Sequence, residues 1–309
     1  MHQHKPWLPY VILAILALIW GSSFILMKEG LKVMTSIQMA SYRIAVCGLI
    51  FFPFVLRHFK KIERQDRKYV LLAGMMGSGI PALLFAMSLE HINSSLAGIL
   101  NAMTPIFTVI IAVIFTKYVL TKSKVWGVIV GFIGALAIIL GKMVYAGDGG
   151  ISVDANEVKY VLMVVLATIL YGANINLIKN KLAKYNAFVI ASTPLFMISL
   201  IAMTIILFTD WSNLSQYPDR QLYRSFGAIT ALAIFGTSMS LVLFNRLVQL
   251  SGPVFASSTT YFIPFVAVFF GLLDGEQVIW VQLLGMSLIL TGVYLINKKA
   301  SPKSNPSAS

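Results

Sequence analysis

The sequence predicts an all-α polytopic membrane protein with ten transmembrane helices, arranged as two inverted five-helix repeats. Its 309 residues are 58% hydrophobic and only 11% charged, with a mean hydropathy of +0.83, whereas about a quarter of the residues in soluble domains are charged. Ten apolar runs are each about as long as a bilayer-spanning helix, which needs roughly 20 residues. The order of residues in the first five runs also recurs, in part, in the last five.

The ten runs are read as helices because backbone polar groups in hydrocarbon must find their hydrogen bonds within the same segment. Charged or turn-forming residues make the strongest breaks, at 57–68, 145–159 and 209–220. The first run is long for a secretory signal and has no obvious cleavage site, so we expect it to be retained. The predicted helices cover residues 10–27, 36–56, 69–89, 94–116, 124–144, 158–178, 187–208, 225–247, 254–273 and 278–297.

The repeat begins with the segments LIWGSSFILMK (18–28) and ILYGANINLIK (169–179). The matches are Trp20-Gly21 with Tyr171-Gly172 and Lys28 with Lys179 at an offset of 151, Gly77 with Gly236 and Pro105 with Pro264 at 159, and Gly127 and Gly134 with Gly285 and Gly292 at 158. Because each half holds an odd number of helices, the second half must enter the membrane from the opposite side. We therefore predict one five-helix repeat over 1–150, another over 151–298, and a disordered cytoplasmic tail over 299–309.

The distribution of lysine and arginine predicts the orientation of the chain. With a cytoplasmic N-terminus, the segments inside the cell hold 17 of the 24 basic residues and those outside hold 6. This ratio places both termini in the cytoplasm and the protein in the plasma (inner) membrane. The net charge of +13 does not indicate nucleic-acid binding, because no basic helix or aromatic-basic patch lies outside the membrane.

The sequence contains no motif for catalysis, for metal binding or for cofactor binding. The chain has no phosphate loop of the G-x4-G-K-[S/T] type, so we expect it not to hydrolyse ATP, and no ATPase subunit is evident. Histidine, cysteine and acidic residues show no metal-ligand spacing, and the single cysteine, Cys47, can form no internal disulfide. We therefore predict no enzyme activity, no metal and no cofactor, with a small-molecule substrate and the lipid bilayer as partners.

Inverted repeats are a recurrent plan of secondary transporters, whose substrate site lies near the midplane where the halves meet. Four segments carry a more specific resemblance: WGSSF (20–24), SYRIAVCGL (41–49), GILNAMTPIFTVIIAVIF (98–115) and the segment from 259 to 296 with Pro264, Gly275-Glu276, Gly285 and Gly292. Together they resemble the ten-helix drug/metabolite transporter superfamily, EamA type, over about residues 8–298. The resemblance implies a membrane carrier, commonly an exporter of amino acids or other small metabolites, with a central cavity between the halves. One departure is that Lys117 stands at the position equivalent to Glu276.

Arg43 is the leading candidate for substrate contact. It lies about seven residues into the second run, where an arginine costs about 2.5–3.5 kcal/mol unless it reaches water or a partner. No aspartate or glutamate occurs inside any run. Two interpretations stay open: the guanidinium faces the cavity and binds a substrate carboxylate, or it bonds backbone carbonyls or Glu90, or extends outward to solvent.

Two equivalent helix faces supply further candidates. Trp20 and Ser23 share a face of the first helix, and Tyr171 and Asn174 share the corresponding face of the sixth. An aromatic ring beside a small polar group suits a mostly apolar pocket that orients one polar ligand. The alternative is that the aromatic rings pack between helices, with the neighbouring glycines, Gly21 and Gly172, allowing close approach.

The fourth and ninth helices each contain a proline after polar residues. Proline removes a backbone donor and frees a carbonyl one turn earlier, here in the segments NAMTP (101–105) and TTYFIP (259–264). Such acceptors need side chains, water or a ligand nearby. We expect Pro105 and Pro264 to be bending or packing points, and the candidate polar groups there are Asn101, Thr260 and Tyr261.

The function expected from these features is secondary transport of a small metabolite by alternating access. Because Arg43 is the one charge placed in the predicted cavity, export of amino acids or similar zwitterionic or carboxylate compounds fits best, and polyamines fit poorly. The alternatives are a carrier for drugs or other metabolites of different charge, and a scaffold or lipid-handling protein that transports nothing. The lack of a carboxylate or histidine within the runs favours facilitated export or exchange over proton coupling.

Overall fold

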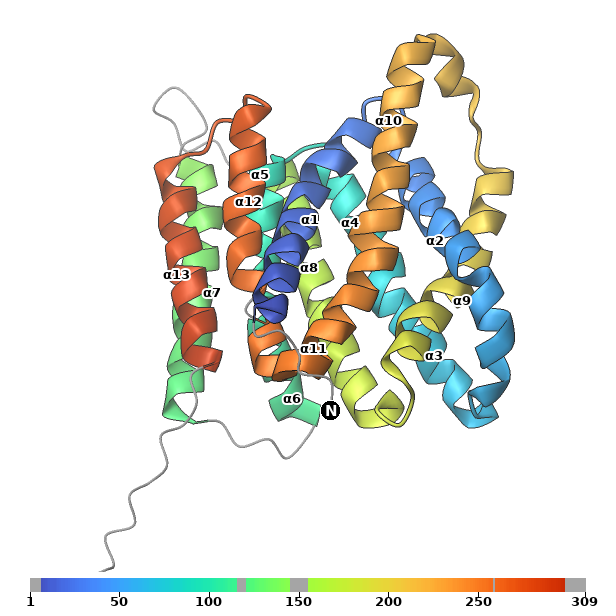
Figure 1. Ribbon diagram of the computed structural model, residues 1–309. Coiled ribbons are helices and arrows are strands. Elements are labelled where there is room, and N and C mark those ends of the chain that lie inside the picture. The colour runs from blue at the N-terminus through green and yellow to red at the C-terminus, as the bar shows by residue number, and fades with distance from the viewer. Residues whose placement is uncertain (1–6, 116–120, 145–154, 258, 298–309) are drawn as a thin grey trace, which may run out of the picture.

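A computed structural model describes residues 7–115, 121–144, 155–257 and 259–297 as a bundle of helices, with no strand in those ranges. Figure 1 shows α7 and α13 side by side at one edge, α2, α3 and α9 at the other, and α1 in the middle. The α-helices are α1 (Leu8–Gly30), α2 (Ser36–His58), α3 (Arg67–Gly74), α4 (Ile80–Leu89), α5 (Ser94–Asn101), α6 (Thr104–Phe115), α7 (Lys122–Val144), α8 (Ala155–Leu177), α9 (Ala187–Phe208), α10 (Asp219–Ala231), α11 (Ser240–Ser257), α12 (Thr259–Leu273) and α13 (Trp280–Asn297).

Nine helical segments of the described chain are long and apolar enough to cross a membrane. Large apolar side chains lie on the outside of the bundle, among them Leu207 (81% exposed) and Phe208 (86% exposed). Such a surface is unfavourable in water but suits contact with hydrocarbon, whose tails are as apolar as leucine. The prediction of an all-helical polytopic membrane protein is therefore confirmed.

Two predicted helices differ in detail from the structure. The run 94–116 forms one apolar segment, Ser94–Phe115, but it is interrupted, because α5 ends at Asn101 and α6 begins at Thr104. The eighth helix extends to Ser257 rather than 247, which leaves α12 with only 15 residues. Continuous hydrophobicity through both regions conceals these breaks, since an apolar run shows neither a change of helix direction nor a short break between helices.

Three segments of the described residues are wound as π-helix, and two of them occupy equivalent places in the repeat. The first, η3 (Met75–Gly79), joins α3 to α4, and η6 (Leu232–Met239) joins α10 to α11. The offset of 159 relates Gly77 of η3 to Gly236 of η6. The third is η4 (Ile178–Leu182) at the end of α8. Because π-helical turns are uncommon and often found at functional sites, η3 and η6 direct attention to the helices around them.

Close helix contacts also follow the sequence repeat. A Cβ added to Gly127 would lie 2.5 Å from the carbonyl oxygen of Gly292, and one added to Gly134 would lie 2.7 Å from that of Gly285. The offset of 158 relates Gly127 to Gly285 and Gly134 to Gly292. The contact of Gly127 with Gly292 is therefore equivalent to the contact of Gly285 with Gly134. The interface between α7 and α13 thus contains the same glycine contact twice, as the repeat requires.

The contacts of α1 and α8 are exchanged in the same way. A Cβ on Gly21 would lie 2.4 Å from the Cβ of Val266 in α12, and one on Gly172 would lie 2.9 Å from the carbonyl carbon of Phe107 in α6. The offset of 159 relates Phe107 to Val266. The predicted repeat boundary at 150 and 151, the tail 299–309 and Lys117 lie outside the described residues.

Candidate functional site

Arg43 extends from α2 toward η6 and is half-buried. Its Nε and Nη2 both donate to Thr237 Oγ1, at 3.1 and 2.9 Å, and its Nη1 lies 3.6 Å from Met27 Sδ in α1. Glu90, one of the partners considered from the sequence, instead accepts hydrogen bonds from the backbone and side chain of Ser36. Arg43 forms no ion pair within the described ranges, so its charge is left without a carboxylate there.

Trp20 of α1 donates hydrogen bonds to the part of η6 that Arg43 also contacts. Its Nε1 donates to the carbonyl oxygen of Gly236 at 3.1 Å and to Ser240 Oγ at 3.0 Å. Its ring lies beside that of Phe244, with 5.4 Å between the centroids. Trp20 and Arg43 thus contact neighbouring residues of one π-helical turn, Gly236 and Thr237, although they come from different helices.

Ser23 is buried beside this turn. Its Oγ donates to the carbonyl oxygen of Ile19 at 2.7 Å, which is the usual way for a serine in a helix to satisfy its donor. A Cβ on Gly236 would lie 3.2 Å from Ser23 Oγ. The absence of a side chain at Gly236 therefore lets α1 approach η6 and brings Ser23 to the Gly236–Thr237 turn.

Asn174 occupies the equivalent place against η3 in the other half. A Cβ on Gly77 would lie only 2.3 Å from Asn174 Nδ2. Asn174 Oδ1 is buried and has no hydrogen-bond partner among the residues that the structure describes. The repeat offsets relate the pair Gly236 and Ser23 to the pair Gly77 and Asn174. The Ser23 hydroxyl makes a hydrogen bond, whereas the Asn174 carbonyl oxygen makes none among the described residues. An unpaired buried acceptor costs about 1–3 kcal/mol, so Asn174 retains the capacity to bind a donor.

Tyr171 lies one helical turn before Asn174 on α8. Its ring stacks on that of Phe85 at a centroid distance of 6.2 Å and an interplanar angle of 25°. This ring contact joins α8 of the second half to α4 of the first.

The remaining sequence candidates do not join this group. Tyr261 Oη donates to the carbonyl oxygen of Val293 at 2.8 Å and accepts from Asn297 Nδ2 at 3.0 Å, so it faces α13. Thr260 lies in the first turn of α12, and Asn101 is the last residue of α5. The side-chain partners of Arg43 in the described chain are Thr237 and Met27.

The two prolines play different structural parts. Pro105 is the second residue of α6, where its missing donor costs nothing, so it starts a helix and does not bend one. The Asn101 carbonyl accepts a hydrogen bond from Thr104 Oγ1 at 2.9 Å. Pro264 is buried inside α12, as expected from the sequence.

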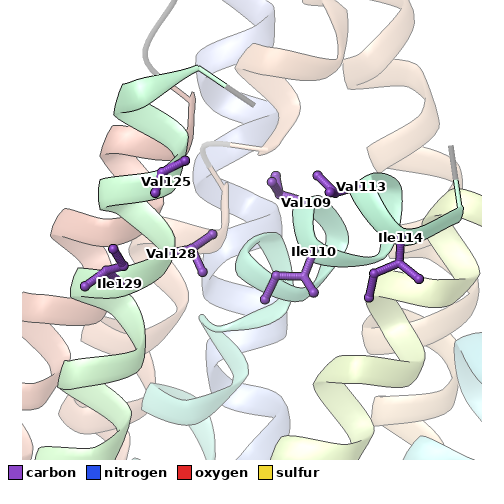
Figure 2. A pocket seen from close by; sticks show the side chains of 7 residues that line it. All are labelled: Val109, Ile110, Val113, Ile114, Val125, Val128 and Ile129. Atoms are coloured by element: carbon purple, nitrogen blue, oxygen red, sulfur yellow. The ribbon is translucent and has the colours of Figure 1, made fainter. Parts of the chain in front are cut away.

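Two cavities of the described chain lie on its flanks. One, of about 220 Å³, lies between α6 and α7 and is lined by apolar residues alone (Figure 2): Val109, Ile110, Val113, Ile114, Val125, Val128 and Ile129. The other, of about 560 Å³, is lined by Ile37, Ile201, Thr204, Ile205, Phe208 and Thr209. Neither is the central cavity that the resemblance implies, and neither includes a candidate residue. Around Arg43 the side chains of Met27 and Thr237 are in direct contact with the guanidinium.

Sequence reasoning missed Thr237 and Ser240 as neighbours of the candidates. The only signal is a short cluster of hydroxyl residues in FGTSMS (235–240), directly after the glycine that matches Gly77. Serine and threonine in helices commonly bond their own backbone, so the cluster gives no reason to expect an arginine partner. The chain order also conceals the contact, because Arg43 and Thr237 are separated by 194 residues.

Comparisons with known proteins agree with this architecture. The chain is 25% identical to an uncharacterized transporter of Archaeoglobus fulgidus, over 94% of this chain and 99% of the relative. It is 25% identical to the uncharacterized inner membrane transporter YedA of Escherichia coli K12, over 91% and 88%. It is 23% identical to an S-adenosylmethionine/S-adenosylhomocysteine transporter of Chlamydia muridarum, over 84% and 82%.

A crystal structure of a protein with 14% sequence identity has the same fold, with a TM-score of 0.61 over 93% of this chain and 96% of that one. The pattern of the EamA-like transporter family matches the sequence twice, at residues 7–140 and 158–298. The two matches take in α1, Arg43 and the π-helical turn that it contacts. The chain therefore belongs to the EamA-like transporter family, whose members are membrane transporters and not enzymes.

Proposed function

We propose that this transporter carries a small metabolite with a carboxylate group, such as an amino acid or a related zwitterionic compound, and exports it by alternating access. The observation that supports the substrate class is Arg43: a charged guanidinium inside the bundle whose partners in the described chain are a hydroxyl and a thioether. A charge that is partly buried without a countercharge is unfavourable. A substrate carboxylate would supply that countercharge, and arginine presents several donors in a planar fork that matches it.

The other candidate residues support a ligand with both polar and apolar parts. Trp20 and Tyr171 provide aromatic surface, while Ser23 and the unpaired Oδ1 of Asn174 provide polar groups. We propose these residues as the substrate contacts. Asn101, Thr260 and Tyr261 are proposed as contacts only in a conformation that moves α5 and α12 relative to Arg43.

The relatives offer one chemical comparison. S-adenosylmethionine and S-adenosylhomocysteine, the substrates in the name of the Chlamydia transporter, both contain an α-amino group and an α-carboxylate. An arginine that binds a carboxylate would serve such molecules as well as free amino acids. The shared amino-acid moiety, rather than any one compound, is therefore the substrate feature that we propose for this chain.

The test is an export panel in cells that overproduce the protein. Cells are loaded with toxic amino-acid analogues, with neutral drugs and with polyamines, and retained compound is measured. We expect reduced retention of carboxylate-bearing compounds and at least a tenfold loss of that effect in Arg43→Ala. Arg224→Ala is the matched control, because Arg224 is 71% exposed in its side chain and pairs with Glu29 at the bundle surface.

Several outcomes would contradict the proposal. Export of neutral or cationic compounds that does not depend on Arg43 would indicate a carrier with a different substrate charge. No change in retention of any compound by a correctly inserted protein would favour a scaffold or lipid-handling role. A pH gradient that drives uptake into proteoliposomes, with the effect lost in Glu90→Gln, would contradict facilitated transport.

A further inference from the structure

A cluster of charged and hydroxyl side chains, partly buried, lies at the end of the bundle where α1 terminates. Its members are Lys28, Ser94, Ser95, Asp274 and Glu276, here called the Glu276 cluster. Glu276 follows Gly275, whose φ of +80° makes the tight turn between α12 and α13. Only 3% of the Glu276 side chain is exposed. A carboxylate this well buried must be paired and hydrogen-bonded.

Both carboxylate oxygens of Glu276 are fully engaged. Oε1 accepts from the backbone N of Ser94 at 2.9 Å, from Ser94 Oγ at 2.8 Å and from Lys28 Nζ at 2.8 Å. Oε2 accepts from the backbone N of Ser95 at 3.0 Å and from its Oγ at 2.7 Å. Since Ser94 and Ser95 begin α5, Glu276 also lies at the positive end of that helix.

The cluster joins the two halves of the molecule. Lys28 and the serines belong to α1 and α5 in the first half, whereas Glu276 belongs to the α12–α13 turn in the second. The close approach of α12 depends on Gly271, where a Cβ would lie 1.9 Å from Ser95 Oγ. The cluster also adjoins the Arg43 site along α1, because Met27, whose sulfur contacts Arg43, is the residue before Lys28.

The residues of this cluster are not repeated in the sequence of the other half. The repeat offsets pair Lys28 with Lys179 and Glu276 with Lys117, so the sequence has a second lysine in place of the carboxylate. The offset of 159 also replaces the serines with Pro253 and Val254, which lack hydroxyl groups. A different ion-paired connection joins the halves at the opposite end, where Lys184 Nζ pairs with Asp66 Oδ2 at 2.9 Å and with Glu63 Oε1, but the Glu63 and Lys184 side chains are 50% and 46% exposed.

We infer that the Glu276 cluster closes the substrate pathway at the Lys28 end and separates each time the carrier opens to that side. This inference rests on the proposed alternating-access function. Opening at the Lys28 end must part α1 and α5 from the α12–α13 turn, which breaks up to five hydrogen bonds to one carboxylate. The cluster therefore favours closure at the Lys28 end, which the sequence predicts to be external.

The test measures how fast a reporter cysteine is reached from each side. Met27→Cys is placed in a Cys47→Ala background, and membrane-impermeant maleimide is added to right-side-out and inside-out vesicles. Met27 is only 3% exposed, so a low labelling rate is expected in the parent. Glu276→Gln removes the charge that holds Lys28, and we expect at least a tenfold faster reaction from the Lys28 end.

Asp274→Asn is the matched control because Asp274 lies in the same turn and also pairs with Lys28, at 2.7 Å, but its side chain is 33% exposed. Asp274→Asn should change the labelling rate by no more than about twofold. A folded Glu276→Gln protein that labels at the parent rate, or that labels faster from both sides equally, would overturn the inference.

A second variant covers the case in which Glu276→Gln does not fold. Lys28→Gln leaves the four serine hydrogen bonds intact and should give a smaller increase from the Lys28 end alone. If neither variant folds, the cluster is a permanent structural connection and the inference is wrong. Labelling needs no transported compound, so an incorrect substrate proposal would leave these results unchanged.

Discussion

Thr237 is the side chain that sets the direction of the Arg43 guanidinium. A single oxygen, Oγ1, accepts from both Nε and Nη2, which leaves Nη1 toward Met27. Two donors on one acceptor restrict the plane of the guanidinium, so the edge available to a carboxylate is defined by Thr237. Its role is to position Arg43.

We therefore expect Thr237→Val to raise the KM for a carboxylate substrate about tenfold, equivalent to about 1.4 kcal/mol, with little change in maximal rate. Thr237→Ser keeps the hydroxyl and should restore the KM. The measurement is concentration-dependent uptake into proteoliposomes, using a substrate identified by the export panel. An equal loss of maximal rate in both variants would mean that Thr237 serves folding rather than Arg43.

Among the helices, the contact between α8 and α6 shows how close packing depends on single glycines. A Cβ on Gly172 would lie 2.8 Å from the backbone N of Thr108 and 2.9 Å from the carbonyl carbon of Phe107. Backbone atoms of a packed helix cannot move aside as a flexible side chain can. The repeat partner Gly21 meets the Val266 side chain instead, so the two equivalent contacts differ in tolerance.

Gly172→Ala should lower the free energy of unfolding by about 1–3 kcal/mol, the usual cost of overpacking. Gly227→Ala in α10 is the control, because nothing lies within 4 Å of its Cβ position and alanine favours a helix over glycine by about 1 kcal/mol. Thermal unfolding in detergent should show a lower Tm for the first variant and an equal or higher Tm for the second. A Tm of Gly172→Ala equal to that of the parent would show that α6 and α8 can separate freely.

For the molecule as a whole, the Glu276 cluster makes stability depend on pH at one end of the bundle. Burial by itself would raise the pKa of Glu276, but hydrogen bonds from Lys28, Ser95 and Ser94 outweigh it and bring that pKa from 4.5 to about 2. A carboxyl whose pKa is lower in the folded state stabilises that state above its unfolded pKa, and loses this effect as the pH falls toward the folded value.

The Tm difference between the parent and Glu276→Gln should therefore stay constant from pH 8 to about pH 5 and shrink as the pH falls toward 3. At neutral pH the charge contributes about 3 kcal/mol by this linkage. Asp274→Asn should differ little from the parent throughout. A difference that grows on acidification would contradict the assignment of Glu276 as an ionised, paired group.

The sequence alone predicts the membrane class, the helical fold and the equivalence of the two halves. These features can be predicted for a physical reason. Hydrocarbon requires every spanning segment to be apolar and internally hydrogen-bonded, so spans can be identified without tertiary information. The unusual position of Arg43 in such a segment is visible for the same reason. The termini's orientation, the repeat boundary and substrate contacts stay predictions.

Which side chains meet was decided by tertiary structure alone. Arg43 meets Thr237, Tyr261 faces α13 and Glu276 caps α5, although each pair is far apart in the chain. Pro105 begins a helix whereas its repeat partner Pro264 lies within one. Apolar composition places a helix in the membrane but does not fix its rotation or its neighbours. The rotation and the neighbours of each helix depend on close packing at residues such as Gly21, Gly172 and Gly271. This packing is visible only in the assembled bundle.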